Sequence, residues 1–324
     1  TLVYRGKIPA LKYGGTERIL WYLGKELHAR GHRVTFLAAP GSYCPFARTI
    51  PLDNTLSLDK QIPAETDLVH LHQDTGEKIS RPHLFTIHGN TRKPKSFHEN
   101  TTFISRNHAR RHHSQVFVYN GLAIDDMEKP DWSRKRAYFH FLGKAAWKVK
   151  NLRGAISITR MAGEKLRVMG GHRLNLKMGI KFHPQPHVRF EGMVAEPQKN
   201  RLLNGSKGLV FPVLWHEPFG LAAIESLYYG CPVFATPYGA LPEIIPKEFG
   251  FLSNSASELA DAIRNRDSYH PVRCHEFVCE HFSTRIMTDR YLELYEKVLN
   301  GEPLNPEKPH MDDPDSSRDL PFYR

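Results

Sequence analysis

Two glutamates are placed where they could hold the two ends of one ligand. Glu217 and Glu225 lie in the segment WHEPFGLAAIESLYYGCP, residues 215–232. Glu225 follows Leu221 by four residues, so it lies one helical turn further along the same face. A carboxylate there can accept two hydrogen bonds from the vicinal hydroxyls of a nucleotide ribose. Glu217 precedes the helix, where its carboxylate could bind sugar hydroxyls and stabilise positive charge developing at an anomeric carbon.

The helix between these acids is predicted from about Gly220 to Tyr229, with Gly230 ending it. Its first backbone N–H groups, at Phe219, Gly220 and Leu221, have no partners inside the helix and suit a phosphate. Gly220 has no Cβ, so an anion can approach its backbone closely. Taken alone, the same spacing also fits an N-terminal helix acid followed by a solvated one.

The elements that must position these residues follow a strand–helix alternation. In the first half, Gly14 and Gly15 precede a helix for which Thr16 is a candidate N-cap and which ends near Gly31. Apolar runs predict its strands at residues 2–4, 34–39, 68–71, 83–87, 102–104 and 116–118. Strands that alternate with helices indicate a parallel sheet covered on both faces.

A polar stretch at residues 125–136 separates a second set of strands, predicted at residues 137–142, 174–178, 188–190, 209–211 and 233–235. We therefore expect two doubly wound, Rossmann-like α/β domains that face each other across a cleft. Residues 1–128 are expected to form the N-terminal domain and residues 129–285 the C-terminal domain. Residues 286–324 are expected to form a helix and tail that cross back to the first domain.

Composition is that of a soluble globular protein, with 40% hydrophobic and 24% charged residues in 324. No apolar run reaches the roughly 18 residues that a membrane span needs. The net charge of +11 is concentrated in residues 81–113 and 129–181, whereas the C-terminal tail is acidic. Such basic stretches indicate either a bound anion or a solvated basic face. Four cysteines without metal-type spacing are expected to be free thiols in a cytoplasmic protein.

Several motifs together resemble the retaining glycosyltransferases of family 4, which have the two-domain GT-B fold. The resemblance rests on the following segments, from the N-terminus onwards: YGGTER (13–18), GHRV (31–34), TIHG (86–89), YNG (119–121), EPFGL (217–221) with Glu225, GCPV (230–233) and YGALPE (238–243). It covers most of the chain. Gly143-Lys144 and Lys150-Asn151 stand where family members usually have Gly-Arg and Lys-Gly.

The resemblance implies a metal-independent transferase that uses a nucleotide-diphospho-sugar, most often a UDP- or GDP-sugar, and no separate cofactor. It implies that Glu225 binds the ribose and that Glu217 and His88 act beside the transferred sugar. The backbone of Phe219, Gly220 and Leu221 would bind phosphate or sugar oxygens. Gly14 and Gly15 would close over the diphosphate, and Lys144 and Lys150 would neutralise it, with Lys148 as an alternative second cation.

No metal is expected. The pairs His70-x-His72 and His112-His113 could bind a transition metal, but surface positions on a strand and a helix are the better interpretation. Acidic residues cluster only at Asp125-Asp126 and at residues 312–315, where we expect them to be solvated. The rival functions are a sugar-nucleotide epimerase or phosphorylase on the same fold, and a non-catalytic module that binds nucleotide sugars or nucleic acid.

The resemblance implies that the N-terminal domain binds the acceptor and the C-terminal domain binds the nucleotide sugar. The N-terminal domain has basic residues of its own. Arg106, Arg110 and His113 recur at spacings of four and three, so they could share one helix face. We therefore hypothesise that the acceptor, or a membrane surface that carries it, is anionic. The expected partners are the nucleotide sugar and this anionic acceptor or surface, without an obligate protein partner. A cytoplasmic location, peripheral at the inner face of the membrane, would fit.

Overall fold

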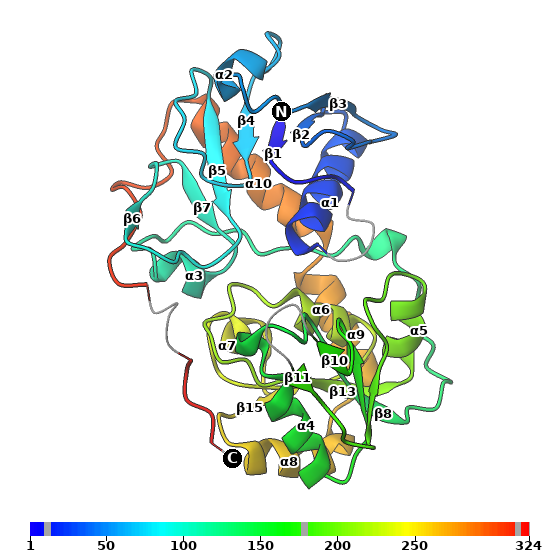
Figure 1. The fold of residues 1–324 in the computed structure, drawn as a ribbon. Helices are drawn as coiled ribbons and strands as arrows, with labels where there is room; N and C mark the ends of the chain where they lie inside the picture. The colour runs from blue at the N-terminus through cyan, green and yellow to red at the C-terminus, as the bar shows by residue number, and fades with distance from the viewer. Residues whose placement is uncertain (10–13, 176–180, 315–318, 324) are drawn as a thin grey trace. The chain divides into compact units, whose positions relative to one another are not determined.

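The computed structural model describes residues 1–9, 14–175, 181–314 and 319–323. The chain divides into two compact units (Figure 1). Unit 1 comprises Thr1–Ile124 and Phe282–Asp315, and unit 2 comprises Asp125–His281 and Ser316–Arg324. No helix among the described residues is both long and apolar enough to cross a membrane.

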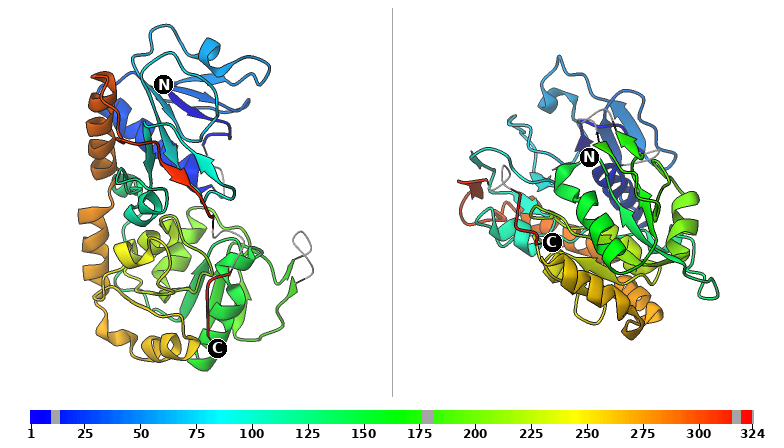
Figure 2. Two further views of the ribbon diagram at one scale, coloured as in Figure 1. Left: turned by 90° about the vertical axis from the view of Figure 1, so that its left-hand side faces the viewer. Right: turned by 60° about the horizontal axis from the view of Figure 1, so that its bottom comes forward.

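Unit 1 is built on a six-stranded parallel sheet in the order β3-β2-β1-β4-β5-β7. Its strands are β1 (Leu2–Tyr4), β2 (Thr35–Ala38), β3 (Arg48–Pro51), β4 (Val69–Leu71), β5 (His83–Ile87) and β7 (Thr101–Phe103). Its helices are α1 (Gly15–Ala29), α2 (Leu58–Gln61), α3 (Arg106–Arg110) and α10 (Thr284–Leu299). Helix α10 packs beside α1, although the two are far apart in the sequence (Figure 1). The antiparallel pair β6 (Lys95–Ser96) and β16 (His310–Met311) holds the C-terminal segment against unit 1 (Figure 2).

Unit 2 repeats this plan with the strand order β12-β9-β8-β13-β14-β15. Its strands are β8 (Tyr138–Leu142), β9 (Leu166–Met169), β12 (Val188–Phe190), β13 (Ser206–Phe211), β14 (Val233–Ala235) and β15 (Gly250–Leu252). A separate antiparallel pair consists of β10 (Leu174–Asn175) and β11 (Lys181–Phe182). Its helices are α4 (Leu152–Met161), α5 (Gln198–Asn204), α6 (Leu221–Tyr228), α7 (Leu241–Ile244), α8 (Ala256–Arg264) and α9 (Pro271–His281).

Strand β8 shows how the second sheet is covered on both faces. Alternation along the strand sends Phe139 and Phe141 into an apolar cluster with α4 and α8. His140, between them, points to the other face, where its Nε2 lies 2.8 Å from Oγ of Ser226 on α6. Its Nδ1 lies 2.6 Å from Oγ of Ser206, so both ring nitrogens of this buried histidine have partners. The doubly wound fold predicted from the sequence is therefore confirmed for each unit.

Two of the predicted strands are wrong, and three strands of the two six-stranded sheets were not predicted. Residues 116–118 form no strand and contribute only an isolated bridge between Phe103 and Phe117. The predicted buried strand at 174–178 is partly outside the described residues, and its first residue, Leu174, is 51% exposed in the β10–β11 pair. Strand β9 takes the sheet position instead. The edge strands β3 and β15 were not predicted.

The junction between the units has a defined backbone geometry on the side of unit 1. Leu122 N–H donates to the carbonyl of Phe282 at 2.7 Å, and Thr284 N–H donates to the carbonyl of Leu122 at 2.8 Å. These bonds form a parallel bridge between Leu122 and Ser283. The point at which the chain leaves unit 1 thus adjoins the point at which it returns.

Candidate functional site

Unit 2 places its candidate residues where the strand order reverses, between β8 and β13. Ligands of doubly wound sheets bind at the carboxyl ends of the strands at this point. The loop after β8 contains Lys144 and Lys150, and the loop after β13 contains Trp215 and Glu217. Each pair is separated from the other by more than sixty residues, so only the parallel arrangement of the strands brings the two loops together.

Lys150 and Glu217 form a buried ion pair. Nζ of Lys150 lies 2.7 Å from Oε2 of Glu217, and the two residues are 7% and 8% exposed. The indole Nε1–H of Trp215 donates to the same oxygen at 2.7 Å. The Lys150 ammonium also lies 4.8 Å from the ring centroid of Trp215 and 4.9 Å from that of Phe211. Sequence reasoning gave the two charges separate tasks, whereas the structure makes them one unit in which each compensates the buried charge of the other.

Two glycines fix the backbone around Glu217. Gly239 has φ of +67°, and a Cβ there would lie 2.3 Å from the backbone N and O of Glu217. The close approach lets Ala240 N–H donate to the Glu217 carbonyl at 2.9 Å. Gly220 caps the N-terminus of α6 with φ of +104°. Both positions favour glycine, because other residues rarely adopt such angles.

Glu225 is buried on α6 and faces a cation that sequence reasoning missed. Its Oε2 lies 3.3 Å from Nζ of Lys199 on α5, and the residues are 3% and 6% exposed. Nζ of Lys199 also lies 3.1 Å from Oε1 of Glu196. No local pattern links positions 199 and 225, so the pairing could not be found without the fold. The Glu225 carboxylate is thereby held in place before any ligand arrives.

The remaining lysines of the loop after β8 differ in their surroundings. The Lys144 ammonium lies 4.8 Å from the ring centroid of Trp147, and Trp147 packs edge-on against Trp215 with centroids 6.3 Å apart. Lys148 has a side chain that is 77% exposed, and its Nζ lies 2.5 Å from Oδ2 of Asp319. Lys144 and Lys150 therefore share an aromatic cluster, whereas Lys148 has the environment of a surface lysine. Neither tryptophan was singled out in the sequence.

Unit 1 gathers three histidines at the ends of β4 and β5. Nδ1 of His72 lies 2.9 Å from Nε2 of His88. His70 stacks on His72 with centroids 3.9 Å apart, and its nitrogens lie 2.7 Å from the hydroxyl of Tyr295 and from that of Thr86. His70 and His72 are 0% and 2% exposed, so the prediction that they lie on a strand surface is wrong. Both ring nitrogens of His70 and Nδ1 of His72 have partners within unit 1, whereas Nε2 of His72 is buried without a hydrogen-bond partner among the described residues.

Desolvation sets the charge state of this histidine group. It lowers the pKa of His88 from 6.5 to about 3, although the residue is partly exposed. It also lowers the pKa of His72 well below 6.5, with a further contribution from His70 and His88. These imidazoles are therefore neutral at pH 7, and His88 can donate or accept a hydrogen bond without carrying a charge.

The other candidates of unit 1 lie on α1 and α3. Gly14 is the N-cap of α1 and Gly15 its first residue, so the prediction of Thr16 as the cap is wrong. Helix α3 contains the exposed Arg106 and Arg110. It ends before His113, whose φ of +53° places it outside the helix. The predicted face shared by Arg106, Arg110 and His113 is therefore wrong.

Comparisons with known proteins bear on the family and on the fold. Residues 136–266, which include both loops of unit 2 and α6, match the family model of the glycosyl transferases group 1. A comparison with curated protein sequences finds no significant match. Among solved structures, AviGT4, a glycosyltransferase involved in avilamycin A biosynthesis, is 21% identical with a TM-score of 0.74, covering 93% of this chain and 97% of its own. Sucrose-phosphate synthase from Thermosynechococcus elongatus is 18% identical with a TM-score of 0.72, covering 93% and 99%. HepE from Anabaena, solved with UDP and glucose, is 13% identical with a TM-score of 0.64, covering 91% and 99%.

The fold of the chain is the GT-B fold of these glycosyltransferases. The matched region and the fold together support a glycosyltransferase enzyme, as the sequence predicted.

Proposed function

We propose that the chain is a retaining, metal-independent glycosyltransferase of family 4 that uses a nucleotide-diphospho-sugar, with a UDP- or GDP-sugar as the first choice. The observation that carries the proposal is the buried Lys150–Glu217 pair at the reversal point of the second sheet. It lies in the chain directly before α6, whose N-terminus suits a phosphate and whose Glu225 suits a ribose.

In the proposed reaction, the bond between the anomeric carbon and the diphosphate oxygen breaks, and its electron pair leaves with the diphosphate. The acceptor oxygen bonds to the same face of the sugar, and its proton passes to the leaving phosphate. Lys144, Lys150 and the N-terminus of α6 neutralise the leaving group. The carboxylate of Glu217 stabilises positive charge at the anomeric carbon. The neutral imidazole of His88 hydrogen-bonds the transferred sugar and forms no covalent intermediate.

The test is release of nucleoside diphosphate from a panel of UDP-, GDP- and ADP-sugars with and without EDTA. We expect release from at least one donor, unchanged by EDTA, and NMR should show that the product keeps the anomeric configuration of the donor. An epimerase would change the donor sugar without releasing nucleotide. A binding module would be stabilised against heat by a donor but would release none. Either outcome, or an inverted product, would contradict the proposal.

The two glutamates should have different kinetic roles. Glu225→Gln should raise the donor KM about tenfold or more with kcat nearly kept, because a ribose contact is equal in ground and transition states. Glu217→Gln should instead lower kcat. Glu196→Gln is the control, because Glu196 also contacts Lys199 but is half exposed. Steady-state kinetics with varied donor measures this, and an equal, pure KM defect in both variants would contradict the roles.

We also propose that the acceptor, or the membrane surface that presents it on the cytoplasmic side, is anionic. Arg106 and Arg110 are both exposed on helix α3 of unit 1. Each cation near an anionic surface contributes roughly 1 kcal/mol, an attraction that salt screens. With donor saturating, the acceptor KM should therefore rise with salt, and Arg106→Ala/Arg110→Ala should raise it at low salt. A KM independent of salt, or unchanged in the double variant, would remove the support for an anionic acceptor.

A further inference from the structure

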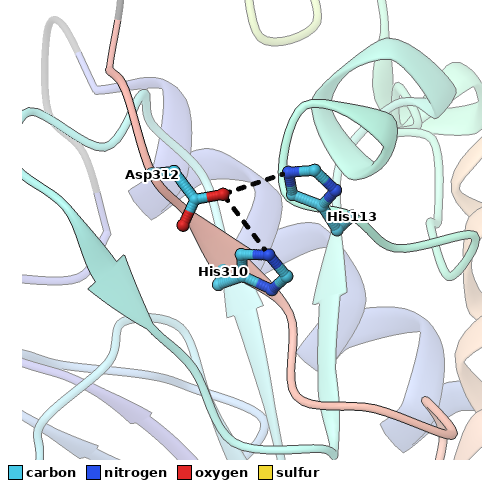
Figure 3. A group of neighbouring side chains, drawn as sticks. All are labelled: His113, His310 and Asp312. Carbon is cyan, nitrogen blue, oxygen red and sulfur yellow. Dashed lines mark ion pairs between the residues drawn. The ribbon is translucent and has the colours of Figure 1, made fainter.

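We propose that His113, His310 and Asp312 of unit 1 form a binding site for a divalent transition-metal ion, with Zn²⁺ as the ion that fits best. The three side chains converge on the surface of unit 1 (Figure 3). One ligand atom from each lies within 4.8 Å of the others. The site is separate from the residues assigned above to the transfer reaction.

The carboxylate of Asp312 lies between the two imidazoles. Its Oδ2 is 3.6 Å from Nε2 of His113 and 3.5 Å from Nε2 of His310 (Figure 3). The two rings are stacked, with an interplanar angle of 3° and centroids 4.2 Å apart. Zinc binds nitrogen and oxygen at about 2.0–2.2 Å in a tetrahedral arrangement, which requires ligand atoms roughly 3.3–3.6 Å apart. The Asp312 oxygen is at about that spacing from both nitrogens, and the histidine nitrogens are within 4.8 Å of each other. Because each imidazole lone pair lies in the plane of its ring, the two parallel rings would have to tilt towards each other to bind one ion.

The tautomer of His310 is set in the way that a metal ligand needs. Its Nδ1 lies 3.2 Å from the backbone carbonyl of Lys308, which can only accept a hydrogen bond. The proton of the neutral ring is therefore favoured on Nδ1, and the lone pair on Nε2 faces Asp312. Histidines that bind metals commonly donate their second N–H to a backbone carbonyl in this way.

Backbone contacts bring the ligands together before any ion binds. His310 N–H donates to the carbonyl of His112 at 3.0 Å, which joins β16 to the turn that contains His113. Asp312 follows His310 by two residues, so both can lie on one side of an extended segment. His113 adopts φ of +53°, an uncommon angle for a residue other than glycine, which directs its side chain away from α3. The site is thus assembled by the fold from positions about two hundred residues apart.

The donor set selects the class of ion. Two imidazoles and one carboxylate suit zinc and its neighbours, whereas calcium and magnesium prefer sets made of oxygen alone. Three protein ligands leave a fourth tetrahedral position for water, as in other zinc sites with three side chains. Since the ligands join β16 to the turn after α3, the bound ion would clip the C-terminal segment of unit 1 in place.

The sequence did not predict this site. His112 and His113 were both expected at the surface, yet His112 is buried and its Nε2 lies 2.7 Å from the hydroxyl of Thr91. Only His113 is exposed, and its partners are close to it in space but not in the sequence. Asp312, which was expected to be solvated within an acidic cluster, is the residue that completes the set.

The test uses the 324-residue chain without a tag. The protein is stripped with EDTA, dialysed, and titrated with Zn²⁺ by calorimetry and by competition with a fluorescent chelator. We expect one equivalent to bind, with a dissociation constant in the micromolar range or below. Bound zinc should also raise the melting temperature, because ligands that bind the folded state stabilise it. Co²⁺ in place of Zn²⁺ should give the visible absorption bands of a tetrahedral site. Absence of stoichiometric binding would overturn the proposal.

Variants of two proposed ligands test whether zinc binds at this site. His310→Ala and His113→Asn should each raise the zinc dissociation constant at least tenfold, and asparagine at position 113 tolerates the left-handed backbone. The control is His98→Ala, since His98 has a carboxylate 3.6 Å away in Glu99 but belongs to no group of three. Circular dichroism would verify that each variant is folded. If zinc binds equally to the parent and both site variants, the ion lies elsewhere and the proposal is wrong.

Discussion

Lys150→Ala is expected to lower kcat/KM by roughly 30- to 1000-fold, the effect of losing one charge-stabilising donor of about 2–4 kcal/mol in the transition state. It should also lower the free energy of unfolding by about 3–5 kcal/mol. The physical reason is that removal of Lys150 leaves the carboxylate of Glu217 buried without its partner at 2.7 Å. Donor-saturated kinetics and urea denaturation measure the two effects.

Three further variants separate catalysis from folding. Lys150→Ala/Glu217→Gln should recover most of the lost stability, because no uncompensated charge remains, but it should stay inactive. Lys148→Ala should leave both quantities nearly unchanged, since that side chain is 77% exposed. Lys144→Ala should resemble Lys150→Ala in activity. Comparable activity in the three single lysine variants would contradict the proposed diphosphate contacts.

Stability should fall steeply as the pH decreases below 6.5. His70, His72, His108 and His140 are at most 2% exposed, and desolvation lowers the pKa of each well below 6.5, to about 3 for His140. Between the two pKa values the unfolded chain binds protons that the folded chain does not, so the free energy of unfolding decreases as the pH falls. Each residue contributes up to about 1.4 kcal/mol per pH unit, and four contribute up to about 5. That is a large part of the 5–15 kcal/mol typical of whole proteins.

Urea midpoints between about pH 7.5 and 5.5 measure this loss. His140→Gln should reduce the slope of the free energy of unfolding against pH by the amount that about one proton contributes, provided that the glutamine still bonds Ser206 and Ser226. His281→Gln is the control, because His281 is exposed in the folded chain. A stability that stays constant over this range would show that the buried histidines are protonated at no cost in the folded chain.

The elements predicted correctly are those with a strong local signal. Leu209–Phe211 and Val233–Ala235 are apolar throughout and buried in the centre of the second sheet. Strand β3 was missed because it is an edge strand, half exposed and closed by Pro51. Strand β9 was missed because Arg167 interrupts its apolar run, although that side chain leaves the core to pair with Glu191 at 2.8 Å.

The features of the candidate site that have a local sequence signal were also predicted, and those that depend on packing were not. The spacing of Glu217 and Glu225 along one loop and helix is visible in the sequence, and so are the glycines that shape their backbone. The partners that compensate the two carboxylates, Lys150 and Lys199, depend on how loops and helices pack, which no spacing records. The burial of His70 was missed for a related reason. Its partner Tyr295 lies 225 residues further along the chain.

The bridge between Leu122 and Ser283 makes residues 125–281 an inserted cassette in the covalent sense. Unit 1 forms backbone hydrogen bonds across the two ends of the inserted segment. Residues 125–281 could therefore be exchanged for the equivalent segment of another protein with the same fold without disturbing the core of unit 1. Such chimaeras would combine one unit 1 with different versions of unit 2. The second piece of unit 2 includes Asp319 and Leu320, and Leu320 N–H donates to the carbonyl of Leu214. This piece would therefore have to be exchanged together with residues 125–281. Exchange therefore needs two matched grafts rather than one.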